Sequence, residues 1–125
     1  MVTALVDSSV LIDVLRGYKP AVDWLATQGR LGVTPIVWLE LIEGAPNKAK
    51  QTAAIKLLRR FDRIVLIPDD MQWAIEQLTR YNLSHNVDSF DCLIASVHHR
   101  LQVTLYTRNL KHFTPLIGDL AQSPY

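Results

Sequence analysis

The chain has 125 residues, which is enough for one domain with a full hydrophobic core. Its composition, 49% hydrophobic and 20% charged, is typical of a soluble globular protein, and no apolar run reaches the length of a membrane span. The formal net charge is +1, from 13 basic and 12 acidic residues, which excludes a generally basic surface for nucleic acid. Any contact with nucleic acid must therefore depend on a local patch or on metal ions bound by the protein's own acids.

Cysteine content and the first residues bear on the compartment. The single cysteine, Cys92, cannot form an internal disulfide, which is typical of proteins of the reducing cytosol. Residues 1–4 place no positive region before an apolar stretch, so they do not resemble a secretory signal. We therefore expect a cytoplasmic protein without membrane association.

The first half of the chain alternates short apolar runs with segments of helical periodicity. Ser8 and Ser9 supply side-chain oxygens suited to capping the first helix, and glycines follow the expected helix ends. In chain order we expect a strand at 3–6, a helix at 8–16, a short helix around 22–26, a strand at 32–36 and a helix at 38–43 that stops at Gly44.

The second half continues this alternation up to a tail that contains Pro115, Gly118 and Pro124, which is expected to be irregular or to form a weak strand or turn. We expect a helix at 49–60, a strand at 63–67, a helix that begins at Asp69 or Asp70 and extends through Tyr81, a helix at 88–101 and a strand at 103–106. Strands that alternate with helices predict a single α/β domain over residues 1–125, with a doubly wound, mainly parallel sheet flanked by helices. Functional sites in such sheets form beyond the carboxyl ends of the strands.

Three acids lie at strand-to-helix junctions or shortly after them. Asp7 ends the first strand, Glu40 lies in an apolar stretch after the second, and Asp91 begins the apolar turn of a later helix. Asp88 lies one turn before Asp91, so we expect one of these two to cap the helix and the other to be free. Taken singly, each acid is also explained as a cap or a polar helix edge.

The joint pattern of these acids points to metal chemistry. Hard cations such as Mg²⁺ take oxygen ligands, using one or two carboxylates and leaving positions for water and phosphate. Clustered carboxylates repel one another, and a bound cation removes that conflict. The sequence therefore predicts a carboxylate site at one edge of the sheet.

Four short motifs resemble, in family order, those of the PIN-domain nucleases. They are VDSSVLI at 6–12, Glu40–Leu41 followed by Gly44, DCLIA at 91–95 and YTRNLKHF at 106–113. Each motif is weak singly, but together they span nearly the whole chain. Within the family, the chain is similar to the VapC-type toxins of toxin–antitoxin pairs.

The resemblance implies a PIN-like fold and an endoribonuclease that depends on Mg²⁺ or Mn²⁺ and hydrolyses RNA to leave a 5′-phosphate and a 3′-hydroxyl. It implies a homodimer and a small antitoxin protein that blocks the acidic pocket. Carried over by position, the catalytic metal ligands are Asp7, Glu40 and Asp91, and the supporting polar residues are Ser9, Thr107 and Asn109.

One position departs from the family pattern. The frequent fourth acid of the family falls at His112. Histidine binds Mn²⁺ but is a poor ligand for Mg²⁺, and a histidine here is more typical of a solvated loop. Asp88 is an alternative source of the missing carboxylate. We therefore hypothesise one firmly bound ion and a second ion that is recruited only with RNA.

Three other functions are weighed against this one. A haloacid-dehalogenase-type phosphatase needs a second Asp two residues after the first, and Ser9 stands there instead. A receiver domain needs a pair of acids after the first strand, and only Asp7 follows it. A degenerate PIN-like module that binds RNA or a partner without catalysis is the remaining alternative. The three retained acids argue against it, and metal-dependent turnover separates the two.

Several chemically capable residues receive simpler interpretations. Cys92 is expected in the core, and His98 and His99 are expected to be structural because a helix C-terminus favours partial positive charge. The tryptophans are expected in the core or at an interface. Scattered basic residues are usually solvated surface, and this applies to Arg16, Lys19, Lys48, Lys50 and Arg108.

Overall fold

The structure is a computed structural model and describes residues 2–125. One parallel sheet lies at its centre, with the strand order β3-β2-β1-β4-β5. The strands are β1 (Ala4–Val6), β2 (Gly32–Val33), β3 (Asp62–Arg63), β4 (Thr104–Tyr106) and β5 (Ala121–Gln122). From β1 the chain winds outward through β2 and β3, and it then returns to add β4 and β5 on the other side of β1. The predicted doubly wound α/β fold is confirmed.

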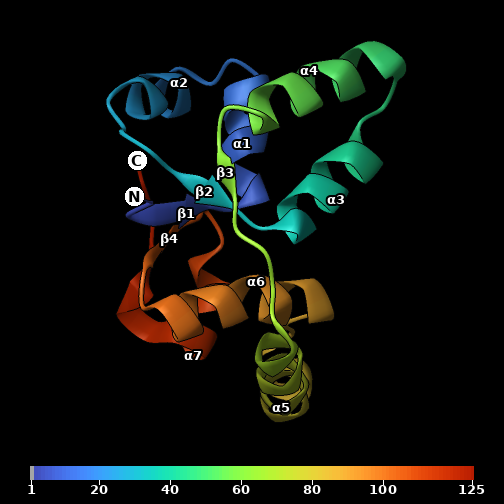
Figure 1. Cartoon of the computed structure of the whole chain (residues 1–125), viewed down its shortest axis with the longest axis vertical. Helices are drawn as coiled ribbons and strands as arrows, with labels where there is room; N and C mark the ends of the chain where they lie inside the picture. The colour runs from blue at the N-terminus through green and yellow to red at the C-terminus, as the bar shows by residue number, and fades with distance from the viewer. Residues whose placement is uncertain (1) are drawn as a thin grey trace.

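Helices cover both faces of this sheet. They are α1 (Ser8–Leu15), α2 (Lys19–Ala26), α3 (Pro35–Gly44), α4 (Lys48–Leu58), α5 (Pro68–His85), α6 (Ser89–Leu101) and α7 (Leu110–Ile117), followed by the 3-10 turn η1 (Gly118–Leu120). In Figure 1, α1, α2 and α4 lie on one side of the sheet, and α5, α6 and α7 lie on the other. Within residues 2–125, no helix combines the length and the apolar character needed to cross a bilayer.

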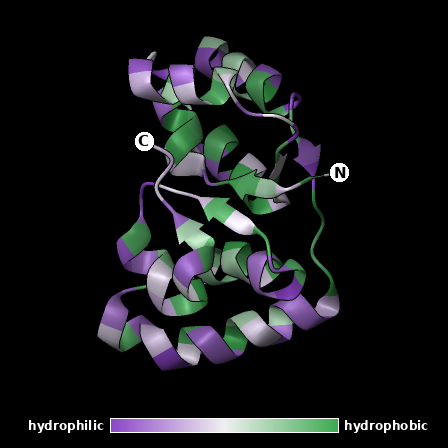
Figure 2. Cartoon of the chain, turned by 90° about the vertical axis from the view of Figure 1, so that its left-hand side faces the viewer, coloured by the Kyte–Doolittle hydropathy of each residue, from purple (hydrophilic) through white to green (hydrophobic). Residues whose placement is uncertain are grey.

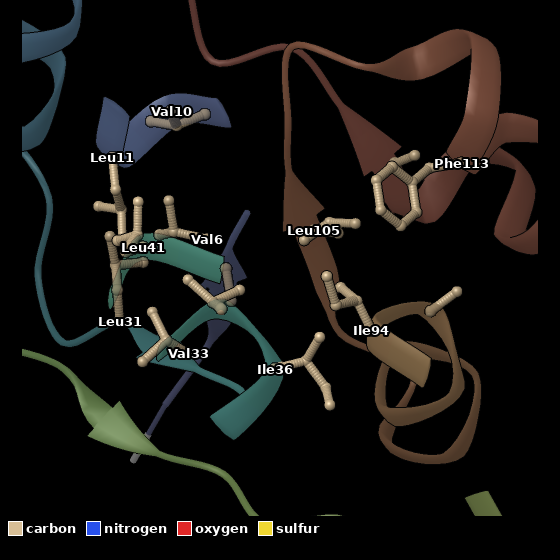
Figure 3. Packing of buried hydrophobic residues seen from close by; sticks show 14 of the residues in the cluster. Val6, Val10, Leu11, Leu31, Val33, Ile36, Leu41, Ile94, Leu105 and Phe113 are labelled. Atoms are coloured by element: carbon tan, nitrogen blue, oxygen red, sulfur yellow. The ribbon is translucent and has the colours of Figure 1, made fainter. Parts of the chain in front are cut away.

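The hydrophobic core fills the space between the sheet and its two helix layers. On one side Leu11 of α1 lies near Val6 of β1, and on the other Ile94 and Phe113 lie near Leu105 of β4 (Figure 3). All five are at most 1% exposed. Burial of each such side chain contributes on the order of 2 kcal/mol, so these contacts hold β1 and β4 in place. Figure 2 shows hydrophobic strands at the centre and largely hydrophilic outer helices.

The second strand is shorter than the sequence predicts. We expected residues 32–36, but β2 ends at Val33 and α3 already begins at Pro35. Proline suits the first position of a helix because its φ is preset and its missing N–H needs no partner there. The helix therefore starts three residues before the expected position 38, and Glu40 lies in its middle.

The predicted strand at 63–67 is also wrong for most of its length. Only Arg63 of that range lies in β3. The N–H of Ile64 still donates to the carbonyl of Val33 at 2.9 Å, but residues 64–67 form no strand before α5 begins at Pro68. Its apolar side chains do not all enter the core, since Val65 is 62% exposed. Asp70 does help to cap α5, but from the third helical position, where its side chain accepts the N–H of Ile67.

The tail contains a helix that the sequence analysis did not predict, and a short strand of the kind that it left open. Residues 110–117 form α7, and β5 pairs in parallel with β4. Proline is accommodated inside α7 at Pro115, and Gly118 ends the helix with a φ of 57°. The interior proline masked the helical spacing of Phe113 and Leu116, which are both buried.

Candidate active site

The candidate site lies where the winding direction of the sheet reverses. β1 and β4 are neighbours with Val6 in register with Tyr106, so Asp7 and Thr107 leave the sheet side by side. The N–H of Asp7 donates to the carbonyl of Tyr106 at 2.9 Å. In open parallel sheets, ligands bind at such a switch point beyond the carboxyl ends of the strands.

Asp7 is buried, with 5% of its surface exposed. Its Oδ2 accepts hydrogen bonds from Thr107 Oγ1 at 2.8 Å and from Ser9 Oγ at 2.9 Å. Asp7 itself occupies the N-cap position of α1 but makes no side-chain capping hydrogen bond. We had expected Ser8 or Ser9 at that position, and neither occupies it. Burial raises the pKa of Asp7, and the bonds from Thr107 and Ser9 offset part of that rise.

Glu40 faces the same region from α3. Its Oε1 is buried and has no hydrogen-bond partner among residues 2–125. Burial raises the pKa of Glu40 to about 7, the negative charges of Asp7, Asp91 and Asp88 add to the rise, and the Ser8 side chain opposes it. The predicted acids therefore lie close enough together for their charges to raise the pKa of Glu40. Glu43, the other acid of α3, is exposed.

Asp88 and Asp91 form a reciprocal cap at the start of α6. The N–H of Asp91 donates to Asp88 Oδ1 at 2.8 Å, and the N–H of Asp88 donates to Asp91 Oδ2 at 3.1 Å. The expectation that one acid would cap and the other be free is therefore wrong. Burial raises the pKa of Asp91, the charges of Asp88 and Asp7 add to the rise, and His112 opposes it.

His112 lies in the first turn of α7, not in a solvated loop. Its Nδ1 is 3.1 Å from Asp91 Oδ2 and 3.0 Å from Asn109 Nδ2, and its side chain is 25% exposed. The N–H of Asn109 donates to Thr107 Oγ1 at 2.9 Å. A chain of polar contacts therefore runs from Asp7 through Thr107, Asn109 and His112 to Asp91.

The carboxylate oxygens of the site suit a hard divalent cation, although the residues do not form a complete coordination shell. Among residues 2–125, no three His, Cys, Asp or Glu side chains stand close enough together to form a ready-made metal site. Mg²⁺ commonly uses one or two carboxylates and keeps several waters, so it does not require such a cage. The unpartnered Glu40 Oε1 and the mutual repulsion of the acids both favour a bound cation.

Two further polar groups near the strand ends were not predicted as site residues. Ser8 was expected only as a helix cap, and its side chain opposes the rise in the pKa of Glu40. Thr34 follows β2 as Asp7 follows β1, with nearly the same backbone angles, and its buried hydroxyl has no hydrogen-bond partner within residues 2–125. The expected strand at 32–36 concealed Thr34, because that prediction placed it inside a strand and not at a strand end.

A largely apolar hollow opens beside the acids, between α1, α3 and α4. Its volume is about 330 Å³, and Glu40 lines it together with Ile12 and Leu15. Arg16 and Lys50 also border it. The hollow therefore joins an apolar surface to one of the candidate catalytic carboxylates.

The fold, the switch-point site and the sequence agree on one family. The PIN domain model matches residues 4–113, and the chain belongs to that family. Ribonuclease VapC10 of Mycobacterium tuberculosis is 34% identical over 120 residues, covering 93% of this chain and 89% of the relative. Ribonuclease VapC19 of the same species is 31% identical over 129 residues, covering 97% and 98%. The structure of a toxin–antitoxin complex from Klebsiella pneumoniae matches with a TM-score of 0.80 at 23% identity, over 98% of each chain, and shows the same fold.

Proposed function

We propose that this chain is a cytoplasmic, metal-dependent endoribonuclease and the toxin of a type II toxin–antitoxin pair. The observation that carries the proposal is Asp7, a buried carboxylate at the switch point that is held by Thr107 and Ser9 and is not used as a helix cap. Membership of the PIN domain family and two relatives named as ribonucleases support it.

The proposed reaction is hydrolysis of an RNA phosphodiester that leaves a 5′-phosphate and a 3′-hydroxyl. Asp7, Glu40 and Asp91 would hold Mg²⁺ or Mn²⁺, which supplies an activated water and stabilises charge on the phosphate. Thr107 and Ser9 fix the rotamer of Asp7 through its Oδ2. The unpartnered Glu40 Oε1 is available to bind the cation or to orient the attacking water.

We propose that one cation binds firmly without RNA and that a second requires it. His112, at the family's fourth acidic position, contacts Asp91 at 3.1 Å and supplies no carboxylate. Calorimetric titration of RNA-free protein should give one Mn²⁺ site, and His112→Asp should add a second. Two equivalent sites in the unmodified protein would contradict this part of the proposal.

A small antitoxin is the proposed protein partner. The hollow lined by Ile12, Leu15 and Glu40 suits an apolar segment that would reach the acids. The similar Klebsiella pneumoniae structure is a toxin–antitoxin complex. Ala53→Arg, which places a long charged side chain in the hollow, should abolish inhibition by the cognate antitoxin and leave RNA cleavage intact. Unchanged inhibition would place the antitoxin elsewhere.

A homodimer is proposed from the family resemblance. Met71 and Ile75, one turn apart on α5, are 51% and 52% exposed and offer an apolar surface for a second copy. Sedimentation velocity should show a dimer for the unmodified chain and a monomer for Ile75→Glu. A monomer at all concentrations would contradict the assignment.

The decisive experiment is cleavage of a mixed RNA pool by antitoxin-free protein in Mg²⁺, Mn²⁺ or EDTA. Glu40→Gln should lose about a hundredfold or more in rate, whereas Glu43→Gln, its exposed neighbour on α3, should cleave normally. Asp7→Asn and Asp91→Asn should be inactive in every metal.

The outcomes of this assay distinguish the alternatives. Absence of cleavage in any metal, by protein shown to be folded, would favour the degenerate module that binds RNA or a partner without catalysis. Cleavage that survives Asp7→Asn would come from a contaminant and leave the proposed site without support. Activity in Mn²⁺ alone would point to His112 as a ligand or to a weakened metal site.

A further inference from the structure

A cluster of aromatic and charged side chains lies next to the acids, although sequence analysis treated its arginine as solvated surface. The guanidinium carbon of Arg108 lies 4.6 Å from the centroid of the Tyr125 ring. Arg108 Nη1 donates to Asp13 Oδ2 at 3.3 Å, and the Tyr125 hydroxyl donates to the same oxygen at 2.8 Å. The Tyr18 ring lies beside them, with its centroid 6.0 Å from that of Tyr125.

This cluster is directly connected to the candidate site. The backbone N–H of Arg108 donates to Ser9 Oγ at 3.0 Å, and Ser9 Oγ in turn donates to Asp7 Oδ2 at 2.9 Å. The residue before Arg108 is Thr107, which donates to the same carboxylate oxygen. An RNA strand with a phosphate at Asp7 would therefore have a neighbouring nucleotide within reach of Arg108.

The cluster is both accessible and held in place. The side chain of Arg108 is 39% exposed and Tyr18 is 45% exposed, whereas the Asp13 side chain that anchors them is 17% exposed. Burial and the bond to Asp13 raise the pKa of Tyr125 to about 12, so its phenol remains a donor at neutral pH. The guanidinium of Arg108 is held in place through Nη1, which donates to Asp13.

We propose that Arg108, Tyr125 and Tyr18 form a stacking platform that holds one unpaired nucleotide of the RNA beside the scissile phosphate. The proposal rests on the ribonuclease function proposed above. Guanidinium and aromatic planes stack on bases of any identity, and each stacked base contributes about 1–3 kcal/mol. Stacking also needs little net charge, which suits a chain whose net charge is +1. The platform predicts a preference for unpaired RNA over duplex.

Binding can be measured separately from cleavage. The protein carries Asp7→Asn, EDTA is present, and the probe is a labelled single-stranded RNA of mixed sequence and about 12 nucleotides. Tyr18→Ala removes an exposed ring without disturbing the bonds to Asp13, and it should weaken binding about tenfold. Tyr18→Phe, which keeps the ring, should bind normally, and Arg108→Gln should weaken binding about tenfold or more.

The control uses a second arginine–tyrosine pair. Arg80 lies 6.0 Å from the centroid of the Tyr81 ring on α5, on the other side of the sheet from α1 (Figure 1). Arg80→Gln makes the same charge change and should leave RNA affinity nearly unchanged. Equal losses of RNA affinity in Arg80→Gln and Arg108→Gln would overturn the proposal. Such a result would mean that any arginine contributes through its charge and that the position of Arg108 does not matter.

A second probe tests stacking itself. RNA with abasic sites keeps its phosphates but has no bases to stack, so Tyr18→Ala should not weaken its binding. An equal loss with abasic RNA, or no loss with either probe, would overturn the platform. If the unmodified protein cleaves RNA in metal and the platform variants bind normally, this inference alone fails. If the unmodified protein does not cleave RNA at all, the proposed function fails.

Discussion

At the scale of single residues, function and stability oppose each other at Asp7. Burial raises the pKa of this carboxyl, so keeping it ionised at neutral pH destabilises the metal-free fold. Asparagine removes the charge and still offers an oxygen to Thr107 and Ser9. Asp7→Asn should therefore abolish cleavage and raise the free energy of unfolding in EDTA.

This prediction is checked by urea denaturation in EDTA and in Mg²⁺. A raised folded-state pKa means that stability is lost as the pH rises, so the advantage of Asp7→Asn should be larger at alkaline than at acidic pH. Mg²⁺ should stabilise the unmodified protein, because a ligand of the folded state adds its binding free energy. The difference in the free energy of unfolding between Asp7→Asn and the unmodified protein should therefore be smaller in Mg²⁺ than in EDTA. A variant less stable in EDTA would contradict the prediction.

His98 is structural, as the sequence analysis predicts, but for a different reason. We expected partial positive charge at a helix end to be favoured, whereas the ring is fully buried and burial lowers its pKa to about 4. Nδ1 donates to the carbonyl of Val103 at 2.9 Å, and Nε2 has no partner among residues 2–125. The buried ring is therefore neutral at neutral pH.

The low pKa of His98 predicts a specific acid sensitivity. The unfolded chain takes up this proton near pH 6.5 and the folded chain only near 4, so stability is full above that window and falls as the pH drops through it. Across this window the free energy of unfolding should fall by about 3 kcal/mol. Urea denaturation at both ends of the window should show this loss, and His98→Asn should lack it. Equal acid sensitivity in both proteins would exclude His98 as the cause.

At the scale of elements, one ion pair fixes α5 against α6. Arg100 donates from Nε to Asp70 Oδ1 at 2.9 Å and from Nη2 to Asp70 Oδ2 at 3.0 Å, and it also reaches the carbonyl of Val65. Asp70 is 2% exposed and also accepts the N–H of Ile67. Arg100 thus connects α6, the helix that carries Asp91, both to α5 and to the segment that follows β3.

Breaking this pair from one side should be costly. Arg100→Met leaves a buried carboxylate without its partner and should lower the free energy of unfolding by about 3 kcal/mol. The double variant Asp70→Asn/Arg100→Met should lose less than the sum of its single variants in a denaturation cycle. Lys19→Met, which breaks an exposed pair with Asp23, serves as the control and should change stability little. Additive single effects would show that the pair does not act as a unit.

At the scale of the whole molecule, the near-neutral net charge limits how RNA is held. The platform supplies one cation, Arg108, and a chain with a net charge of +1 has no overall basic excess, so affinity for single-stranded RNA should fall only weakly with salt. We expect a slope of about −1 to −2 in a plot of log affinity against log salt concentration. Fluorescence anisotropy with the Asp7→Asn variant in EDTA measures it. A slope near −5 would show extensive phosphate contacts and argue against stacking as the main mode of binding.

The sequence determined the features that depend on local periodicity. The alternation of strands and helices, the position of Asp7 at the end of β1 and the N-cap of α6 at Asp88 all follow from side-chain patterns that extend over a few residues. The predicted helices were wrong where a proline altered the expected pattern. Pro35 moved the start of α3 forward, and Pro115 hid α7. Asp7 and Asp91 were identified because they lie at or near such boundaries, whereas Glu40 lies in the middle of α3 and was identified by the apolar residues around it.

Contacts between residues far apart in the chain became visible only in the folded molecule. Thr107 donates to Asp7 across 100 positions of the chain, and Tyr125 donates to Asp13 across 112. No local pattern encodes such contacts, because they depend on the placing of β4 beside β1 and on the return of the chain to α1. The same holds for the contact of His112 with Asp91, for the shared cap of α6, and for Arg108, which becomes a binding candidate only once its neighbours are known.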